Sequence, residues 1–424
     1  MNRLFTYLIV GAMVLGVLTG WILNTTLPAA EAAAAADNLN ILTNMFLRLI
    51  KMIIAPLVFS TLVVGIAHMG DASEVGRVGV KTISWFILAS ITSLMLGLVM
   101  VHLLEPGAGL SIALPDAAAG GPGVDVSKFT LAEFVTHLVP SSIVDAMARN
   151  EILQIVVFSV FVGTAISAID DKAPQVLALV EQIAQIMLKV TGYVMRFAPV
   201  AIFSALAAAI TTKGLGVLVT YAKFVGGFYL SLGLLWVLLV AVGVIIVGPR
   251  VLKLIGALRS PILLAFSTAS SEAAYPRTLE ELQKWGVSRK VASFVLPLGY
   301  SFNLDGSMMY CTFAVLFIAQ VYGIELSIAQ QITMLALLMI TSKGMAGVPR
   351  ASIVVIAATL AYFDLPEAGV ALILAVDQLL DMGRSATNVV GNSVASAVVA
   401  RWENQIEEPQ DEALVQPQAK PAAE

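Results

Sequence analysis

Ten long apolar segments alternate with short polar connections along the chain, and their lengths predict a protein that crosses a membrane. Eight of them are apolar throughout and long enough to span a bilayer, which takes about 20 helical residues. These eight cover about residues 1–24, 41–69, 79–104, 151–169, 174–212, 217–248, 291–320 and 367–400. The other two, about residues 251–284 and 327–362, are apolar at both ends and polar in the middle.

The first apolar segment has two possible interpretations. It follows Arg3 and precedes an alanine-rich stretch at residues 29–36, so a cleaved secretory signal is the alternative to a transmembrane helix. The apolar run is long enough to span, and many spans follow it. We therefore expect residues 1–24 to form the first transmembrane helix.

Two polar clusters interrupt the remaining segments, STASSEAAYP at Ser267–Pro276 and SKGMAGVPRAS at Ser342–Ser352. If the N-terminus is cytoplasmic and both broken segments leave the membrane on the side where they entered, most basic residues lie on the cytoplasmic side, as the positive-inside rule requires. These residues are Arg77, Lys81, Lys172, Arg250, Lys253, Arg259, Arg277, Lys284, Arg289, Lys290 and Arg401. The expected fold is all-α and membrane-embedded, with eight transmembrane helices, two re-entrant helical hairpins and both termini in the cytoplasm.

Composition agrees with this pattern. The chain has 424 residues, of which 58% are hydrophobic and 12% charged, whereas soluble domains carry about a quarter charged residues. The net charge of −4 gives no reason to expect a nucleic-acid partner. One cysteine, Cys311, and three histidines exclude an intramolecular disulfide and make a His/Cys metal site improbable. Residues 106–128 are interpreted as an external loop, and the acidic, proline-rich tail from residue 403 as disordered.

The hairpin tips are the first candidate for chemistry. Backbone that leaves helical geometry inside a membrane lines a cavity or is buried in protein, and secondary transporters bind solutes at such discontinuous helices. Freed N–H groups attract anions and freed carbonyls attract cations. The tips Ser270–Ser271 and Ala346–Pro349 suit that role. The alternative is a pair of kinked structural helices with small residues for packing.

The segment GYSFNLDGSMMY, Gly299 to Tyr310, is the second candidate. Asn303, Asp305 and Gly306 interrupt an apolar run there, and an ionisable side chain in mid-span is a functional candidate. Asn and Asp side chains with freed carbonyls offer the hard oxygen ligands of a small cation. Alternatively, or in addition, Asp305 caps a local helix break.

The last apolar segment carries the strongest pattern, DQLLDMGRSATNVVGN. Asp377, Asp381, Arg384, Asn388 and Asn392 follow one another at spacings of four, three, four and four, which places them on one helix face. Arg384 can hold a carboxylate bidentately, and Asp381 can accept an ammonium group. A self-satisfied Asp381–Arg384 ion pair is the alternative.

Together these motifs resemble the dicarboxylate/amino acid:cation symporters, the family of excitatory amino acid transporters and their prokaryotic homologues. The resemblance covers nearly the whole chain, and its most specific parts are AFSTASSEAAYP, NLDGS, AGVP and DxxxDMGRxxxNxxGN. It implies a homotrimer in a bacterial-type cytoplasmic (inner) membrane, in which a mobile transport domain slides against a scaffold like an elevator. The implied division is scaffold at 1–70 and 105–212, transport domain at 71–104 and 213–402, and tail at 403–424.

The resemblance also implies roles for individual residues. The substrate would bind Ser270, Ser271, Ser307, Gly347, Val348, Asp381, Arg384, Ser385 and Asn388. Cation coupling would involve Ser90, Glu272, Gly299, Ser301, Asn303, Asp305, Ser342 and Asn392, with a possible sodium site at Gly299, Asn303, Asn388 and Asn392. Phe86, Ala89 and Met345 occupy further family cation positions.

Several departures from the family pattern bear on the coupling ion. Sodium-coupled members usually have an acid at Asn392, and oxygen-bearing side chains at the three positions held here by Phe86, Ala89 and Met345. A poorer oxygen cage, together with the extra carboxyl of Glu272 at the first tip, leads us to favour protons over sodium. Arg350 stands where glycine is common and could pair with Glu272 or Asp381.

Having both Asp381 and Arg384 favours an acidic amino acid, L-aspartate or L-glutamate, as the substrate. The alternative is a C4-dicarboxylate such as succinate, fumarate or malate, whose carriers in this family tend to lack the acid at Asp381. Polar residues concentrated at two tips and two spans disfavour a channel. Asp381 and Ser271 without an adjacent histidine do not make an enzyme site, and no cofactor is expected.

Overall fold

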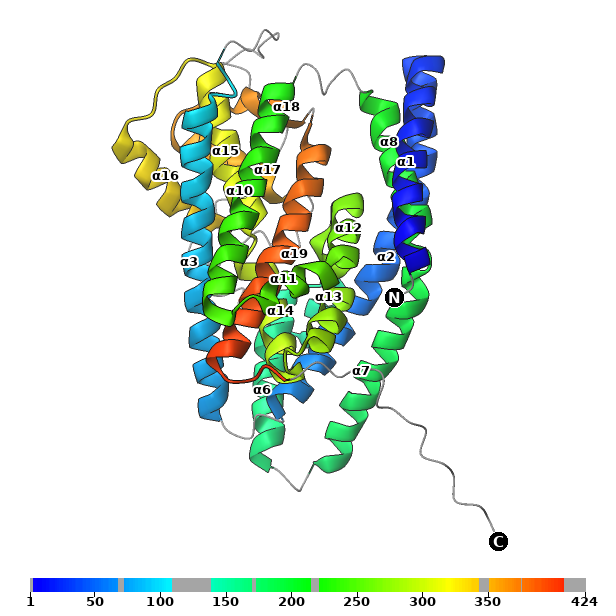
Figure 1. The fold of residues 1–424 in the computed structure, drawn as a ribbon, viewed down its shortest axis with the longest axis vertical. Coiled ribbons are helices and arrows are strands. Elements are labelled where there is room, and N and C mark those ends of the chain that lie inside the picture. Colours follow the sequence, from blue (N-terminus) through cyan, green and yellow to red (C-terminus); the bar gives the residue numbers. More distant parts are fainter. Residues whose placement is uncertain are drawn as a thin grey trace.

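The chain is a bundle of helices in the computed structural model, which describes residues 3–67, 72–108, 139–169, 173–214, 221–342, 351–374 and 376–407 (Figure 1). Within these residues the regular structure is helical, apart from one isolated antiparallel bridge between Val287 and Ile406. The all-helical class expected from the sequence is confirmed.

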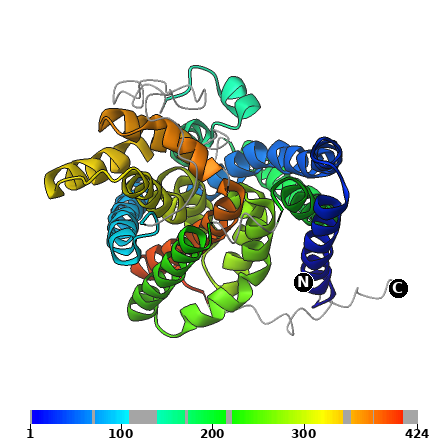
Figure 2. The ribbon, with the colours of Figure 1, turned by 90° about the horizontal axis from the view of Figure 1, so that it is seen from above.

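A first group of helices packs around α2, and its members α1 and α8 lie at one side of the bundle in both ribbon views (Figures 1 and 2). α1 packs along α8, and α2 contacts α6, α7 and α8. The bounds are α1 Arg3–Thr26, α2 Ala29–Ala67, α6 Ile152–Ile169, α7 Pro174–Met195 and α8 Ala198–Lys213, and a short helix α5, Ile143–Arg149, precedes α6. Many apolar side chains of this group, such as Leu15 and Phe161, are exposed, as lipid-facing residues are.

The second group surrounds α19, Asp377–Trp402, which contacts α3, α10, α12, α13, α14 and α15. Every residue of α19 from 382 to 400 is buried. The surrounding helices are α3 Ala72–Leu104, α10 Ala222–Val247, α11 Arg250–Ala257, α12 Arg259–Thr268, α13 Ser271–Trp285, α14 Arg289–Phe302, α15 Asp305–Val321, α16 Ile328–Thr341, α17 Ala351–Tyr362 and α18 Val370–Leu374. A polar helix face in this position must therefore contact protein rather than lipid.

The first broken segment forms the expected helical hairpin. α12 ends at Thr268, Ala269 adopts a left-handed conformation with φ of 49°, and Ser270 caps α13. A left-handed residue followed by an N-cap serine reverses the chain within two residues. The second broken segment likewise consists of two helices, α16 and α17, but its tip at residues 343–350 lies outside the described residues.

Five described helical spans are long and apolar enough to cross a membrane, or six if the bent pair α11–α12 is counted as one. The eight expected spans are therefore only partly matched by this criterion. Three local differences from the expected segments occur, and the first two have simple causes. α2 begins at residue 29 because the alanine-rich stretch has a high helix propensity; the segment 174–212 is split before Pro199; and the last segment is split into α18 and α19.

The first residues of the tail differ from the expected disordered segment. The backbone N–H of Ser288 donates to the carbonyl of Gln405 at 3.0 Å, and that of Glu407 donates to Gly286 at 2.7 Å. The Glu403 side chain pairs with Arg77 and Lys81 of α3. Residues 403–407, which we name the C-terminal strap, therefore join α3 to the α13–α14 junction.

Candidate functional site

The chain breaks its helix between α14 and α15, inside the buried core. The backbone N–H of Asn303 makes the last hydrogen bond of α14 by donating to the carbonyl of Gly299 at 2.8 Å, and α15 then begins at Asp305. The N–H of Gly306, in the first turn of α15, donates to Oδ1 of Asn388 at 2.9 Å. A side chain of α19 thus caps α15, and it satisfies one of the N–H groups that a helix start leaves open.

Two carboxamides and one carboxylate form a buried network at this break. Nδ2 of Asn303 donates to Oδ2 of Asp305 at 2.9 Å and to Oδ1 of Asn392 at 3.1 Å. The hydroxyl of Ser93 on α3 donates to Oδ1 of Asp305 at 3.2 Å. Asn303, Asp305 and Asn392 are each 0% exposed. A carboxylate buried this deeply depends on such hydrogen bonds, or on a bound cation or proton, to offset its lost hydration.

Two glycines allow the helices to approach this network. A Cβ atom at Gly391 would lie 1.9 Å from Oδ2 of Asp305, and one at Gly299 would lie 2.3 Å from Oδ1 of Asn392. Neither position has room for a side chain unless the buried Asp305 or Asn392 moves. The glycine of the NLDG motif, Gly306, meets the backbone of α19 in the same way, with a Cβ position 2.7 Å from the carbonyl of Arg384.

Several buried polar atoms near the break have no hydrogen-bond partner among the described residues. They are Oδ1 of Asn303, Nδ2 of Asn392 and Oγ of Ser301. The two amide orientations are assignments, so either amide can present its oxygen. Oxygen atoms that are buried and free of donors are the ligands that a small cation uses. Gly299, Asn303, Asn388 and Asn392 are close neighbours, as the sequence predicted, but their role in binding a cation stays a prediction.

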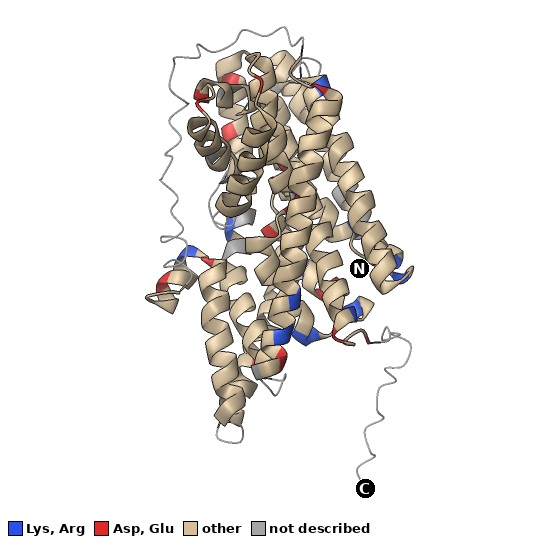
Figure 3. Cartoon of the chain, turned by 90° about the vertical axis from the view of Figure 1, so that its left-hand side faces the viewer, with Lys and Arg blue, Asp and Glu red and all other residues tan. Residues whose placement is uncertain are grey.

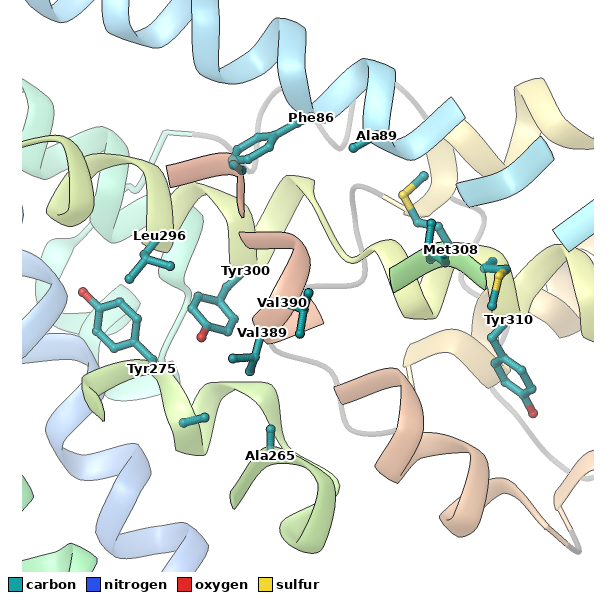
Figure 4. Packing of buried hydrophobic residues seen from close by; sticks show 14 of the residues in the cluster. Phe86, Ala89, Ala265, Tyr275, Leu296, Tyr300, Met308, Tyr310, Val389 and Val390 are labelled. Atoms are coloured by element: carbon teal, nitrogen blue, oxygen red, sulfur yellow. The ribbon is translucent and has the colours of Figure 1, made fainter. Parts of the chain in front are cut away.

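Three of the residues expected at cation positions, Phe86, Ala89 and Ser90, lie on α3. Phe86 and Ala89 face α14 and α15 (Figure 4), and Ser90 is 0% exposed. Phe86 brings a ring and Ala89 a methyl group, and neither supplies an oxygen. Ser93, which the sequence reasoning missed, supplies the hydroxyl that contacts Asp305. The spacing Phe86, Ala89, Ser90, Ser93 marks one helix face and could have identified it.

Arg384 is the centre of the second cluster. Its side chain is 2% exposed, and Nη2 lies 3.0 Å from Oδ1 of Asp377 and 2.9 Å from Oδ1 of Asp381. The guanidinium carbon lies 4.1 Å from the ring centroid of Tyr310, whose hydroxyl donates to Asp377 at 3.3 Å. Its Nε and Nη1 have no hydrogen-bond partner among the described residues. The internal Asp381–Arg384 pair exists, yet it uses only one of the three guanidinium nitrogens.

Asp381 differs from its neighbours in exposure. Its side chain is 34% exposed, whereas that of Asp377 is 8% exposed. Ser385 is buried one position after Arg384, and the hydroxyl of Ser307 accepts from Nδ2 of Asn388 at 3.2 Å. The amide of Asn388 therefore connects the Arg384 region to the helix break. All five polar residues of the expected α19 stripe lie on this helix.

Neighbouring helices fix the rotation of α19. The indole N–H of Trp236 on α10 donates to the Thr387 hydroxyl at 2.8 Å. The hydroxyl of Tyr229 on α10 donates to the Leu379 carbonyl at 2.6 Å. Both contacts lie on the side of α19 that faces α10. They hold the polar face of α19 toward α14 and α15.

The first hairpin tip carries the other expected residues. Ser270, Ser271 and Glu272 are half-buried, and both arms of the hairpin pack against α19. The Ser270 hydroxyl accepts from the N–H of Ala273 at 3.2 Å, so it caps α13. Among the described residues, no hydrogen bond joins Ser270 to Arg384. On α13 and α14, the rings of Tyr275 and Tyr300 lie next to each other in an edge arrangement (Figure 4), with centroids 5.6 Å apart.

The second tip is described only at its edge. Ser342 is 3% exposed and its hydroxyl donates to the Met339 carbonyl at 3.3 Å. Met345, Gly347, Val348 and Arg350 lie outside the described residues. Their expected roles stay predictions.

The sequence analysis assigned no individual function to two further residues of the Arg384 cluster. Asp377 was recognised only as part of the α19 stripe, and Tyr310 was not singled out. An aromatic residue in an apolar helix usually belongs to the core, so no sequence signal distinguishes Tyr310. The i,i+7 spacing of Asp377 and Arg384 was the available signal for the acid.

Comparison with known proteins places this geometry in context. A family profile described as the sodium:dicarboxylate symporter family matches residues 5–402. The chain is 38% identical over 406 residues to the proton/sodium-glutamate symport protein of Bacillus subtilis (strain 168), covering 94% of this chain and 92% of the relative. It is 40% identical over 405 residues to the proton/glutamate-aspartate symporter of Escherichia coli (strain K12), covering 93% and 92%. It is also 40% identical over 370 residues to the C4-dicarboxylate transport protein of Laribacter hongkongensis, covering 85% and 83%.

Proposed function

The chain belongs to the sodium:dicarboxylate symporter family, and on that premise we propose that it imports an acidic amino acid, L-aspartate or L-glutamate, together with cations. The observation that carries the proposal is the buried Arg384 beside the partly exposed Asp381. An acidic amino acid presents two carboxylates and one ammonium group. A guanidinium and a carboxylate one helical turn apart match one of these carboxylates and the ammonium group.

Binding would replace part of the internal ion pairing. Arg384 keeps Nε and Nη1 for a substrate carboxylate, because the described contacts use Nη2. The ammonium group would approach the Asp381 carboxylate, while Asp377 and the Tyr310 ring keep the guanidinium in place. Ser270, Ser271, Ser307, Ser385 and Asn388 are proposed to contact the rest of the substrate, with Gly347 and Val348 closing over it. A preorganised site of this kind costs little ordering on binding.

The coupling ion is proposed to be the proton. The network around Asp305 contains one carboxylate and two neutral amides, and the position that carries an acid in sodium-coupled members holds Asn392. Glu272 at the first tip is a second, half-buried carboxyl that could carry a proton. Sodium at Gly299, Asn303, Asn388 and Asn392 is the alternative, which the unpartnered Asn303 oxygen supports. Ser90, Ser301 and Ser342 would contribute to coupling in either case.

A C4-dicarboxylate is the second candidate substrate. Asp381 already forms an ion pair with Arg384, and a dicarboxylate would need only the arginine. The relative from Laribacter hongkongensis is named for C4-dicarboxylate transport. A dicarboxylate has two carboxylates, like the amino acid, but no ammonium group to offset the negative charges of Asp377 and Asp381, which is why we rank the amino acid first.

The wider architecture is also a proposal. We propose that the first group of helices forms a scaffold, that α3 and the helices from α10 to α19 form a mobile transport domain, and that three copies assemble in the cytoplasmic membrane. The division of the helices around α19 is compatible with an elevator mechanism. The protein is proposed to act as a carrier and not as an enzyme, and no cofactor is proposed.

Uptake into proteoliposomes tests the proposal. Labelled aspartate, glutamate and succinate are offered separately under an inward proton gradient, an inward sodium gradient, and neither. We expect saturable aspartate or glutamate uptake driven by the proton gradient. Preferred uptake of succinate would show that the substrate is a C4-dicarboxylate and not an amino acid. Uptake that follows only the sodium gradient would show that sodium, and not the proton, is the coupling ion.

A further inference from the structure

A basic cavity lies at the junction of α11 and α13, and it is separate from the residues proposed to bind substrate and cations. Its volume is about 280 Å³, and it is lined by Arg250, Lys253, Ala257, Glu281, Lys284 and Trp285. Three cationic side chains and one carboxylate thus surround the space. The proposed transport function uses none of these residues.

The single carboxylate at this cavity is already engaged. Oε1 of Glu281 lies 2.6 Å from Nη2 of Arg277 and 3.6 Å from Nζ of Lys284. Arg250 and Lys253 have no ion-pair partner among the described residues. The cavity therefore has an uncompensated positive charge, which an anion would neutralise.

Packing contacts give the cavity a defined wall. The indole N–H of Trp285 donates to the Arg250 carbonyl at 3.2 Å, which ties the start of α11 to the end of α13. The Arg250 guanidinium carbon lies 5.6 Å from the centroid of the same indole ring. Trp285 is 8% exposed, so its ring forms a buried wall beside the Arg250 guanidinium.

The helix beside the cavity has the amphipathic character that is typical of helices at a membrane interface. α11 buries Val251 and Leu254 at 0% exposure, and Arg250 and Lys253 line the cavity. The helix meets α12 at 47°. Leu252 on the same helix is 59% exposed. A short, bent, basic and amphipathic helix of this kind lies at the boundary between headgroups and acyl chains.

The charge distribution agrees with this placement. Figure 3 shows several Lys and Arg in the middle and lower part of the bundle, with some Asp and Glu among them, and few in its upper part. Ile245, near the adjoining end of α10, is 81% exposed and provides apolar surface next to α11. Acyl chains can pack on such surface while a headgroup enters the cavity.

We propose that this cavity binds the phosphate headgroup of an anionic phospholipid. Arg250, Lys253 and Lys284 neutralise the phosphate, the Trp285 ring supports the glycerol region, and the acyl chains lie along the exposed residues of α10 and α11. Basic pockets of transmembrane proteins on the cytoplasmic side bind anionic headgroups in this way. Because α11 connects α10 to the first hairpin, a bound lipid would attach the base of that hairpin to the bilayer.

Lipid retention by the purified full-length protein tests the proposal. The protein is equilibrated in detergent with phosphatidylglycerol or phosphatidylcholine, and retained lipid is counted by native mass spectrometry. The test variant is Arg250→Gln with Lys253→Gln. The control is Arg196→Gln with Lys223→Gln, which also removes two positive charges, one just after the end of α7 and one at the start of α10, and neither residue lines the cavity. Inorganic phosphate is added as a competitor in a separate arm.

We expect wild type and control to retain phosphatidylglycerol in preference to phosphatidylcholine. The test variant should bind phosphatidylglycerol more weakly by about fivefold for each removed charge at low ionic strength. Equal losses in test and control variants would overturn the proposal, because the effect would then follow total charge. If inorganic phosphate at equal concentration displaces phosphatidylglycerol, the cavity binds a free anion and not a lipid headgroup, and the proposal is overturned. If the double variant does not fold, Lys253→Gln alone, at an exposed position, must still show the fivefold loss.

Discussion

The guanidinium carbon of Arg384 lies 4.1 Å from the ring centroid of Tyr310, and the Tyr310 hydroxyl donates to Asp377, which also accepts from Arg384. Three residues from α15 and α19 thus hold one another. The stack covers one face of the guanidinium, while hydrogen bonding fixes one nitrogen. Nε and Nη1 of Arg384 keep no hydrogen-bond partner among the described residues, which is what the proposed binding of a carboxylate requires.

Removing the Tyr310 ring should weaken substrate binding. A buried cation–π contact contributes about 2 kcal/mol, so Tyr310→Leu should raise the substrate KM by at least about tenfold. Tyr310→Phe keeps the ring and loses only the long 3.3 Å hydrogen bond, so it should change KM by less than about threefold. Initial uptake rates in proteoliposomes measure both. Equal effects of the two variants would show that the hydroxyl, and not the ring, orients Arg384.

Neutralising Asp381 should separate the two substrate candidates. Charge-assisted hydrogen bonds contribute about 1.5–3 kcal/mol, so Asp381→Asn should weaken aspartate or glutamate binding by roughly 10- to 100-fold. Succinate, which has no ammonium group, should bind as well as before or better. Arg384 keeps Asp377 at 3.0 Å, so the buried cation stays paired in this variant. Competition of each unlabelled compound against labelled substrate gives the affinities, and parallel losses for aspartate and succinate would contradict an ammonium-binding role.

The sequence was informative where polar residues interrupt an apolar run. It placed the helix break at Asn303, the hairpin tip at Ser270 and the polar face of α19, because each exception to an apolar pattern inside a membrane needs a protein partner. Periodicity along one helix was enough to group Arg384 with Asp381.

Contacts between helices were not predictable in this way. Ser93 meets Asp305 and Tyr310 meets Arg384 only because α3, α15 and α19 pack at particular rotations, and pairwise packing leaves no mark on a single segment. Hydropathy also misjudged the ends of α2 and the division at Pro199, since both depend on helix propensity and proline geometry.

Adding one methyl group at Gly391 should disrupt the hydrogen-bond network of Asn303, Asp305 and Asn392. A Cβ there would lie 1.9 Å from Oδ2 of Asp305, and overpacking of a buried site costs about 1–3 kcal/mol. Gly391→Ala should reduce uptake at least about tenfold. Gly233→Ala on α10 is the matched control, because no atom lies within 4 Å of its Cβ position, and it should transport normally. Normal uptake by Gly391→Ala would mean that the Asp305 network is not needed for transport.

Restoring an acid at Asn392 should change the coupling ion. In Asn392→Asp the new carboxylate would face the Asn303 amide, now 3.1 Å from the Asn392 oxygen, and would complete a set of hard oxygen ligands. We expect uptake by this variant to gain a dependence on the sodium gradient that the wild type lacks. Asn392→Ala, which adds no ligand, should not gain it. Sodium-driven uptake by the wild type at the same level as the variant would contradict this explanation of proton coupling.

The C-terminal strap should make stability depend on pH through Glu403. The Glu403 side chain is 2% exposed, and this burial raises the pKa of its carboxyl. The hydrogen bonds and positive charges of Arg77 and Lys81 outweigh burial, so the pKa lies below its usual value of 4.5. A carboxyl whose pKa is lower in the folded state stabilises the fold above the unfolded pKa, and this stabilisation is lost as pH falls through the folded pKa. Glu403→Gln should therefore lower the Tm in detergent by roughly 1–3 °C at pH 7, a small change because Arg77 is half exposed. The difference from wild type should shrink as the pH falls below 4.5 and through the folded pKa of Glu403. The control Glu407→Gln, at the exposed end of the strap, should have the Tm of wild type at every pH. A difference in Tm between Glu403→Gln and wild type that persists unchanged at low pH would show that the backbone bridge, and not this ion pair, holds the strap.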